Sequence, residues 1–425
     1  MPLTRDDLTH ATQYETDSGT VELALEELRG RVSERAFTGE TVLLNMGPQH
    51  PSTHGVLRIL LELDGETVVG CHPDVGFLHT GVEKNMEFKA YEKALVMTDR
   101  LDYLNPMGNN LAYCLAIEKL VELDVPARAQ CIRVMMAELH RLNSHLLWLA
   151  THAIDLAAQS LFLYCFRERE YILDLFEMVS GQRMMGSYIR PGGVWRDLPE
   201  EFEPALRTFL DYLPYKIDDY ERLLKNNPIW VERTKGIGIL TAEDAIRWSV
   251  TGPCLRGAGV NYDVRKAFPY SGYEQFEFEI PLGTKGDVYD RYRVRIEEMH
   301  QSLRIIRQAI DRLPGGPYRS QNRKFVPPPR AEIGVSMEAL IHHFKLWTEG
   351  FHAPVGEVYV RTESPHGELD VYLHGDGGPT PYRVHLRTPS FTNLQALGIM
   401  ARGCMLSDLV AVIGSLDFVM GDCDR

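Results

Sequence analysis

The chain has 425 residues, of which 44% are hydrophobic and 24% are charged, and its formal net charge is −14. This length is enough for a large core of two or three structural units. The acidic balance, without any basic tract or interleaved basic and aromatic residues, argues against nucleic acid as a partner.

Three further features of the composition limit the class of protein. No stretch approaches 18 uninterrupted apolar residues, so the sequence predicts no membrane-spanning helix. The first residues are polar and acidic, unlike a secretory signal or a mitochondrial transit peptide. The seven cysteines are scattered and form no Cys-x-x-Cys pair, which is typical of a reduced, intracellular protein without an iron–sulfur or zinc motif of its own.

A loop with two histidines is the first informative motif along the chain. It reads GPQHPSTHG and spans residues 47–55. Pro51 restricts His50 to an extended conformation, so His50 and His54 do not share a helix face as paired metal ligands often do. Glycine and proline at both ends are typical of turns. The sequence therefore predicts a shaped loop that presents two imidazoles. The alternative is a turn whose histidines have no role.

Two apolar-rich runs after this loop predict a β-hairpin. Residues 56–63 and 67–71 are separated by Asp64-Gly65, which fits a tight hairpin turn because glycine tolerates a positive φ. The turn then lies at one end of the hairpin, and the histidine loop lies with residues 72–76 at the other. Because chemistry usually sits on loops held by a rigid scaffold, this placement favours a functional loop.

Helical periodicity dominates the middle of the chain. Residues 105–109 are expected to be a break, 236–273 to be irregular, and 127–180 to contain a kink or break. The segment 127–180 is apolar on most sides, which is typical of helices inside a bundle. Together the long helices predict an antiparallel bundle. The predicted helices span 83–99, 111–123, 127–180, 202–226 and 288–312.

The C-terminal part mixes short helices and strands. The expected fold class is therefore α+β and helix-rich, with the N-terminal hairpin region packed on the central antiparallel helix bundle. The predicted C-terminal elements are helix 337–347, strands 355–360 and 370–374, and helices 392–400 and 407–416. The expected segments are an arm at 1–40, an α+β region with the histidine loop at 41–106, the helix bundle with inserted loops at 107–313, and a C-terminal α+β region at 314–425.

Five motifs occur in a fixed order along the chain: GPQHPSTHG, DRLDY, YIRPGGV, TGPCLRG and DFVMGDCDR, beginning at Gly47, Asp99, Tyr188, Thr251 and Asp417. Together they resemble the motifs of the D subunit of the proton-pumping NADH:quinone oxidoreductase, respiratory complex I. The resemblance runs from about residue 41 to the end, and five long motifs in register are highly specific. It implies a fold like that of the large subunit of nickel–iron hydrogenases, a site of quinone reduction, and an adjacent subunit carrying the terminal [4Fe–4S] cluster.

The hydrogenase relationship allows a chemical test of metal binding. Those enzymes hold nickel and iron with two pairs of cysteines, and the resemblance aligns these pairs with Asp102 and Asn105 and with Val419 and Asp422. Soft thiolates hold such metals, whereas valine cannot ligate and the other three side chains offer hard oxygens. We therefore expect no nickel–iron centre, no metal and no cofactor bound by this chain, which leaves the pocket free for an organic substrate.

Quinone reduction adds two electrons and two protons, so proton donors are needed at both carbonyl oxygens. Imidazole titrates near neutrality, and a phenol donates through a defined O–H. The resemblance places the catalytic and quinone-binding pair at His54 and Tyr103, and places Asp155 as the carboxylate that pairs with His54. Without the resemblance, Tyr103 is better interpreted as a core aromatic and Asp155 as a capping or kink residue. For His50, a role in the site and a purely loop-shaping role both stay open.

Some positions depart from the pattern of the resemblance or stay ambiguous. Many relatives have arginine at Thr80, a basic residue at His366, and a histidine beside the terminal cluster at Met185. A thioether cannot take up a proton, so Met185 predicts a low cluster potential that is nearly independent of pH, which suits menaquinone better than ubiquinone. The alternative is that Met185 simply packs and that another histidine, such as His79, couples the cluster potential to pH. Arg190 and Arg256 are candidates for contacts to the cluster subunit, the alternative being arginines that stabilise loops.

The sequence therefore predicts a core subunit of complex I that takes electrons from a cluster in its partner, reduces quinone and couples the reduction to proton translocation. The expected partners are the iron–sulfur cluster subunit, a hydrophilic subunit of the C type, the membrane subunit at the quinone site, and quinone. The expected location is peripheral, on the cytoplasmic side of the bacterial cell membrane.

Two other functions compete with this prediction. One is a non-catalytic scaffold that docks the iron–sulfur subunit to the membrane arm; the set His54, Tyr103 and Asp155 argues against it, since a scaffold needs no proton donors. The other is a zinc hydrolase that uses His50 and His54, for which a third ligand and a general-base glutamate are missing.

Overall fold

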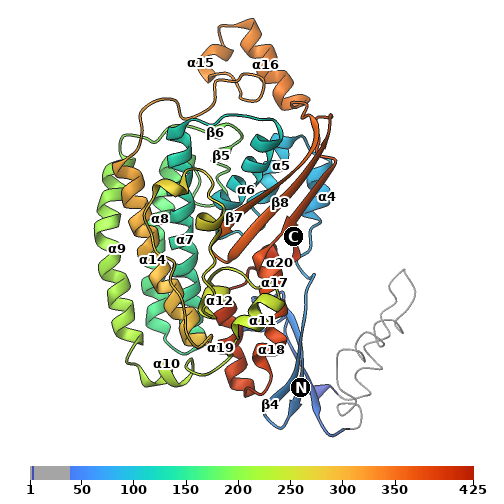
Figure 1. The fold of residues 1–425 in the computed structure, drawn as a ribbon, viewed down its shortest axis with the longest axis vertical. Helices are drawn as coiled ribbons and strands as arrows, with labels where there is room; N and C mark the ends of the chain where they lie inside the picture. The colour runs from blue at the N-terminus through green and yellow to red at the C-terminus, as the bar shows by residue number, and fades with distance from the viewer. Residues whose placement is uncertain (1, 4–38) are drawn as a thin grey trace, which may run out of the picture.

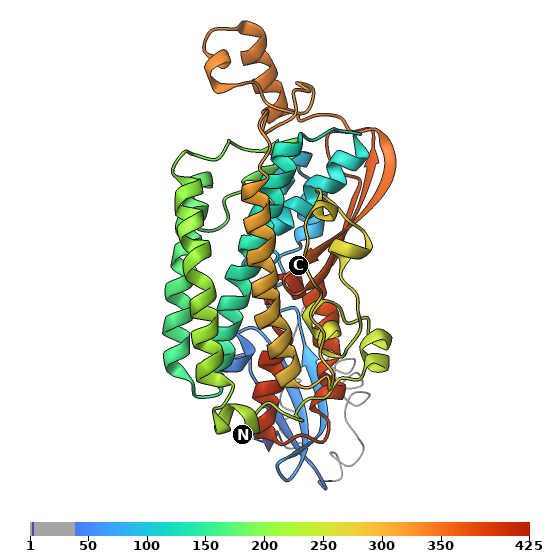
Figure 2. The same cartoon turned by 60° about the vertical axis from the view of Figure 1, so that its left-hand side comes forward.

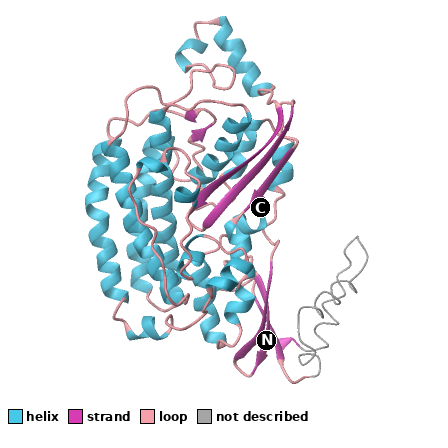
Figure 3. Cartoon of the chain, in the orientation of Figure 1, coloured by secondary structure: helices cyan, strands magenta, loops and turns pink. Residues whose placement is uncertain are grey.

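The computed structural model describes residues 2–3 and 39–425, so most of the expected arm at 1–40 lies outside the described residues. Long helices occupy one side of the molecule and the sheets the other (Figures 1 and 3). The described strands form three small antiparallel sheets, and the fold is α+β and helix-rich. In the part of the chain that the structure describes, every helix is too short or too polar to span a bilayer.

The N-terminal sheet contains the predicted hairpin. Its strands are antiparallel in the order β1 (Pro2–Leu3), β2 (Val42–Met46), β3 (Arg58–Asp64) and β4 (Thr67–Asp74). Gly65 takes a φ of 60° in the β3–β4 turn, as the Asp-Gly dipeptide predicted. Arg58 pairs with Asp74 at the far end of the hairpin, so the histidine loop does meet the exit of β4. Strand β2 was not predicted.

Four long helices form an antiparallel bundle along the long axis of the molecule (Figure 2). Helix α7 contacts α8 and α14, and α9 contacts the same two helices. The predicted break within 127–180 falls at 156–158, where Ala157 has a φ of 67°. These helices are α7 (Ala127–Asp155), α8 (Gln159–Ser180), α9 (Phe202–Leu224) and α14 (Val288–Asp311).

The chain does break between the first two predicted helices, but it does so at 99–105 and not at 105–109, because Pro106 is the first residue of helix α6 (Pro106–Leu120). Proline suits this position, since its fixed φ is helical and the first turn needs no N–H from it. The helix predicted at 83–99 is in fact two, α4 (Val82–Glu87) and α5 (Tyr91–Thr98). The short elements between the long helices are β5 (Ile189–Arg190), β6 (Gly193–Val194), α10 (Pro228–Glu232), α11 (Ala242–Arg247), α12 (Gly252–Gly257), α13 (Val264–Ala267) and the 3-10 turn η3 (Tyr273–Gln275).

The C-terminal part begins with helices α15 (Arg330–Ile333) and α16 (Met337–Thr348), at one end of the molecule (Figure 1). A three-stranded sheet follows, and both of its long strands pack on α6. Strand β9 was not predicted. The remaining elements are β7 (Val355–Ser364), β8 (Gly367–Asp376), β9 (Arg383–Arg387), α17 (Pro389–Gln395), α18 (Leu397–Ala401), α19 (Leu406–Leu416) and α20 (Met420–Asp424).

Two hydrophobic cores organise the fold. The larger one contains the bundle, α6 and the inner face of the β7–β9 sheet. The smaller one joins the hairpin to the C-terminal helices, with Ile59, Leu61 and Val68 buried against residues such as Met400 and Leu409. The hairpin thus packs on α18 and its neighbours. We had expected it to pack on the central helix bundle. The reason is that its apolar face matches the apolar helices α17–α19, which are remote from it along the chain.

Candidate functional site

The histidine loop is held by its own hydrogen bonds. His50 is extended, with φ −147° and ψ 137°, and its Nδ1 accepts a hydrogen bond from the Ser52 N–H at 3.2 Å. The Thr53 hydroxyl donates to the carbonyl oxygen of His50 at 2.9 Å. Gly47 has a φ of 86°, and a Cβ there would clash with the Leu57 carbonyl oxygen. His50 therefore caps the 3-10 turn η2 (Pro51–Thr53), which is the loop-shaping role left open from the sequence.

His54 ends this turn in the left-handed region, with a φ of 55°. The loop packs against α19, and the His54 ring stacks on buried Phe418 with centroids 5.0 Å apart. Desolvation by the surrounding atoms lowers the pKa of His54, and the negative charge of Asp417 partly opposes this shift. His54 is thus mainly a neutral imidazole at pH 7, and Asp417 is the carboxylate whose charge acts on it.

Tyr103 lies in the turn between α5 and α6 and is half-buried. Burial, and secondly the charge of Asp102, raise the pKa of its phenol. The hydroxyl forms no hydrogen bond with any residue that the structure describes. Tyr103 therefore offers a protonated phenol whose O–H is not engaged within the described chain.

Asp155 is the last residue of α7 and is half-buried. Burial raises the pKa of its carboxyl to about 6. Within the described residues Asp155 forms no ion pair, and it does not contact His54 through a hydrogen bond or ion pair. Both α7 and the His54 loop pack on α19, where Trp148 donates to the Gly414 carbonyl oxygen at 2.7 Å. The pairing of Asp155 with His54 stays a proposal for the assembled site.

Replacing Asp155 with asparagine is expected to stabilise the protein above pH 6. A raised pKa means that the folded state favours the protonated carboxyl. The free energy of unfolding therefore falls as the pH rises from about 4 to about 6, and it stays at the lower value above pH 6. The shift from 3.8 to about 6 corresponds to at most about 3 kcal/mol, reduced by solvent screening of a half-exposed group. Thermal unfolding of the purified subunit should show a larger gain in Tm for Asp155→Asn at pH 8 than at pH 5. Equal gains at both pH values would contradict the shifted pKa.

A buried group of charged side chains lies beside the positions that the resemblance aligns with the hydrogenase cysteines. The His366 Nε2 lies 3.2 Å from Asp102 Oδ2, and its Nδ1 lies 3.2 Å from Asp417 Oδ2. Burial opposes the charge on His366, but Asp417 and Asp102 outweigh it and raise its pKa well above the ordinary value. Burial raises the pKa of nearby Asp422 to about 6. We call Asp102, His366 and Asp417 the buried triad.

The geometry of the buried triad differs from that of a metal site. Its two carboxylates contact opposite nitrogens of one ring, so no point lies within reach of three ligands. Across the described residues, no group of three or more histidine, cysteine, aspartate or glutamate side chains is arranged to hold a metal ion. The sequence pointed to His366 only as a departure from relatives and to Asp417 only as the start of a motif, and neither suggested the triad.

The two candidate partner-contact arginines have different surroundings. Arg256 is fully buried, and its guanidinium contacts Glu298 Oε1 and Glu363 Oε1, each at 2.7 Å. It is therefore a structural arginine and is not accessible to a partner. Arg190 is half-buried and stacks over Trp195, with its guanidinium carbon 4.0 Å from the ring centroid.

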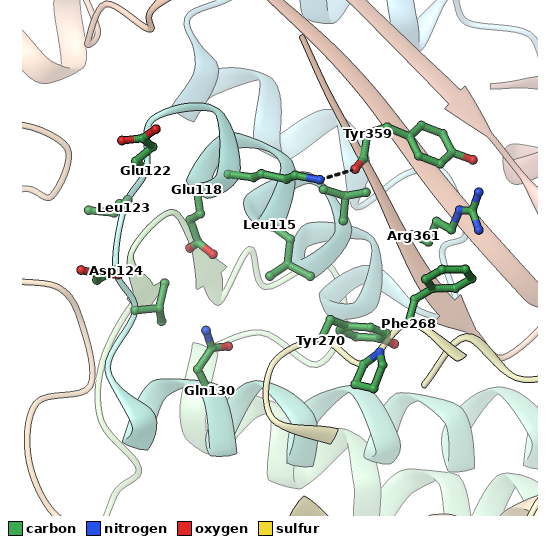
Figure 4. A pocket seen from close by; sticks show the side chains of 14 residues that line it. Leu115, Glu118, Glu122, Leu123, Asp124, Gln130, Phe268, Tyr270, Tyr359 and Arg361 are labelled. Atoms are coloured by element: carbon green, nitrogen blue, oxygen red, sulfur yellow. Dashed lines mark hydrogen bonds between the residues drawn. The ribbon is translucent and has the colours of Figure 1, made fainter. Parts of the chain in front are cut away.

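A large cavity of the described structure lies elsewhere. It has a volume of about 840 Å³ and is formed by the end of α6, residues 268–270 and β7 (Figure 4). Charged and aromatic side chains line it, among them Glu118, Tyr270 and Arg361. None of His54, Tyr103 and Asp155 lines it. The sequence-predicted site residues are thus separate from this cavity.

Comparisons with known proteins give the family of the chain. A family described as "Respiratory-chain NADH dehydrogenase, 49 Kd subunit" matches residues 155–425. The D 2 subunit of NADH-quinone oxidoreductase from Chloroflexus aurantiacus is 60% identical over 93% of this chain and 97% of the relative. The D 2 subunit from a Roseiflexus species is 58% identical over 93% and 96%, and the D subunit from Geotalea uraniireducens is 54% identical over 91% and 99%. The chain therefore belongs to the family of NADH-quinone oxidoreductase D subunits, the 49 kDa subunits of the respiratory-chain NADH dehydrogenase.

Proposed function

We propose that this chain, with a cluster-bearing partner subunit, forms the site where the complex reduces quinone, and that the reduction is coupled to proton translocation. The observation that carries the proposal is the free phenol of Tyr103, a half-buried and protonated donor without a hydrogen bond in the described chain. The hydroxyls of three fully buried tyrosines, Tyr91, Tyr113 and Tyr292, also lack a partner in the described chain, but Tyr103 is only half-buried, so a substrate can reach its hydroxyl. A substrate oxygen would complete its hydrogen bonding.

The two donors differ in how they supply protons. The [4Fe–4S] cluster of the partner would supply the electrons, and negative charge would then develop on the quinone oxygens. Tyr103 donates its O–H to one of these oxygens, and its raised pKa keeps it protonated until that moment. His54 donates a ring N–H to the other oxygen. Asp155, with its pKa of about 6, exchanges a proton near neutrality and replenishes His54 in the assembled site.

The buried triad supports a hydrogenase-like fold for this proposal. The segments that carry the aligned positions meet in space, since a Cβ at Gly421 would clash with the Leu101 carbonyl oxygen. The carboxylates of Asp102 and Asp422 stand at two of the aligned positions and the His366 imidazole contacts Asp102, so the region is suited to handling protons. We infer that the chain is a peripheral subunit on the cytoplasmic side of the membrane. Its proposed partners are the cluster subunit, the C-type hydrophilic subunit and the membrane subunit at the quinone site, and menaquinone is the quinone that Met185 favours.

A photoreactive quinone analogue, used on the intact complex, tests where quinone binds. We expect labelling of this chain at the peptides around His54, Tyr103 and Phe418, and we expect excess unlabelled quinone to suppress it. Labelling confined to the 840 Å³ cavity, at residues 115–130 or 359–361, would contradict the site. The cavity serves as an internal control, because the hydroxyls of its two tyrosines, Tyr270 and Tyr359, already form hydrogen bonds within the chain.

A further inference from the structure

A fully buried imidazole between two carboxylates has no role in the mechanism proposed above. His366 lies in the turn between β7 and β8 and is 1% exposed. Both ring nitrogens face carboxylates at 3.2 Å, Asp102 on one side and Asp417 on the other. Burying one imidazole between two carboxylates costs desolvation energy that apolar residues in the same space would avoid. A group of this kind calls for a role beyond filling the core.

The backbone of the turn holds His366 firmly in this position. The His366 N–H donates to the Ser364 hydroxyl at 3.2 Å, and its carbonyl oxygen accepts from the Asn393 side chain at 3.1 Å. The Ser144 hydroxyl of α7 lies 3.3 Å from Nε2. Gly367 follows with a φ of 144°, and a Cβ there would clash with Thr251. The ring therefore has little freedom to leave either carboxylate.

Each carboxylate of the buried triad lies next to one of the proposed proton donors, either along the chain or through a stacked ring. Asp102 precedes Tyr103, and its Oδ1 accepts from the Leu104 N–H at 3.0 Å, which stabilises the turn that carries the phenol. Asp417 precedes Phe418, on which the His54 ring stacks, and its charge acts on His54. The His366 ring therefore contacts both the carboxylate next to Tyr103 and the carboxylate that acts on His54.

The surrounding charges show how strongly the two carboxylates depend on His366. Asp417 has a second cation, because Arg295 of α14 lies 3.3 Å from its Oδ2. Asp102 has no other cation within ion-pair distance among the described residues. The other titratable groups nearby are Asp422 of α20, whose carboxyl accepts from the Ser390 N–H at 3.0 Å, and His145 of α7, which lies 2.9 Å from Glu298. Without the cation, Asp102 would be a buried, unpaired carboxylate beside Asp422.

We propose that His366, as an imidazolium, is the positioning residue of the quinone site: it holds the carboxylates of Asp102 and Asp417 in place, and through them it fixes Tyr103 and His54. This inference rests on the proposed function. It assigns His366 a charge-based role: a different cation at this position would serve, whereas a neutral side chain would not. The raised pKa of His366 agrees with a cation that persists through the neutral range.

Two variants of the assembled complex test this role, His366→Gln and His366→Lys. Glutamine keeps the polarity and removes the charge, whereas lysine keeps a positive charge that can contact both carboxylates. NADH oxidation with an artificial acceptor upstream of the quinone site reports assembly. We expect His366→Gln to lower quinone turnover about 10-fold to 100-fold, as loss of a residue that orients site groups does. Its pH profile should also differ from that of the wild type, because the buried Asp102 then has no cation within ion-pair distance among the described residues.

The outcome for lysine decides between a charge-based role and other roles. We expect His366→Lys to restore both the turnover and the wild-type pH profile. If glutamine leaves turnover and pH profile unchanged, or if lysine assembles yet fails, the inference is overturned. If glutamine prevents assembly, the lysine variant alone decides on the same two readouts. Tyr103→Phe in the same assay separates the proposed quinone site from the proposed role of His366. If Tyr103→Phe loses turnover while His366→Gln keeps it, only the role of His366 is refuted.

Discussion

Replacing Tyr103 with phenylalanine is expected to lower quinone turnover about 10²-fold to 10³-fold while the complex still assembles. The substitution removes one hydroxyl that bonds to no described residue, so no hydrogen bond within the described part of the chain is lost. The ring and its half-buried packing stay. Removing one donor to a developing oxyanion typically costs this much in rate, about 2.7–4 kcal/mol. The effect should therefore fall on turnover and leave the stability of the complex unchanged.

Steady-state quinone reduction by the purified complex measures this effect, with NADH oxidation by an upstream artificial acceptor as the assembly readout. Tyr215→Phe is the matched control, because Tyr215 is 71% exposed on α9 and also loses only a hydroxyl. The control should keep wild-type turnover. Wild-type turnover in Tyr103→Phe itself would remove Tyr103 from the site and favour the alternative of a non-catalytic scaffold.

Replacing Arg256 with alanine is expected to destabilise the protein by at least about 3–5 kcal/mol, enough to prevent folding of a marginally stable domain. Arg256 joins three fully buried carboxylates: Glu298 and Glu363, each at 2.7 Å, and Asp263 at 3.6 Å. Truncation leaves those carboxylates without their shared cation and leaves a cavity where the side chain was. The burial that hides Arg256 from partners is thus the reason for its importance to stability.

Urea denaturation of the purified subunit, or its yield in the soluble fraction if unfolding is complete, measures this loss. Arg247→Ala is the matched control: Arg247 is two-thirds exposed on α11, where it contacts Glu243 at 2.7 Å. An exposed pair of this kind contributes about 0–1 kcal/mol. A similar small change for both variants would show that the buried carboxylates find other partners or take up protons at little cost.

Local patterns predicted the elements that depend on short-range chemistry. The Asp-Gly turn, the helices of the bundle and the break within 127–180 follow from turn preferences and apolar periodicity, and all are present. The failures also have local reasons. Pro106 suggested a break because proline disrupts helix interiors, although it is favoured at the first helical position. The strands β2 and β9 are five residues each, too short for alternation to be distinctive.

Family membership follows from the residues alone, because five motifs in register identify it and the high identity to its members confirms it. The resemblance that these motifs establish pointed to His54, Tyr103 and Asp155 as site residues. The meeting of Asp102, His366 and Asp417, and the burial of Arg256, became visible in the folded chain. The physical reason is that buried charges are defined by their partners, and these partners come from a helix connection, a hairpin turn and the end of a C-terminal helix. No periodicity along the chain records which carboxylate meets which cation across the core.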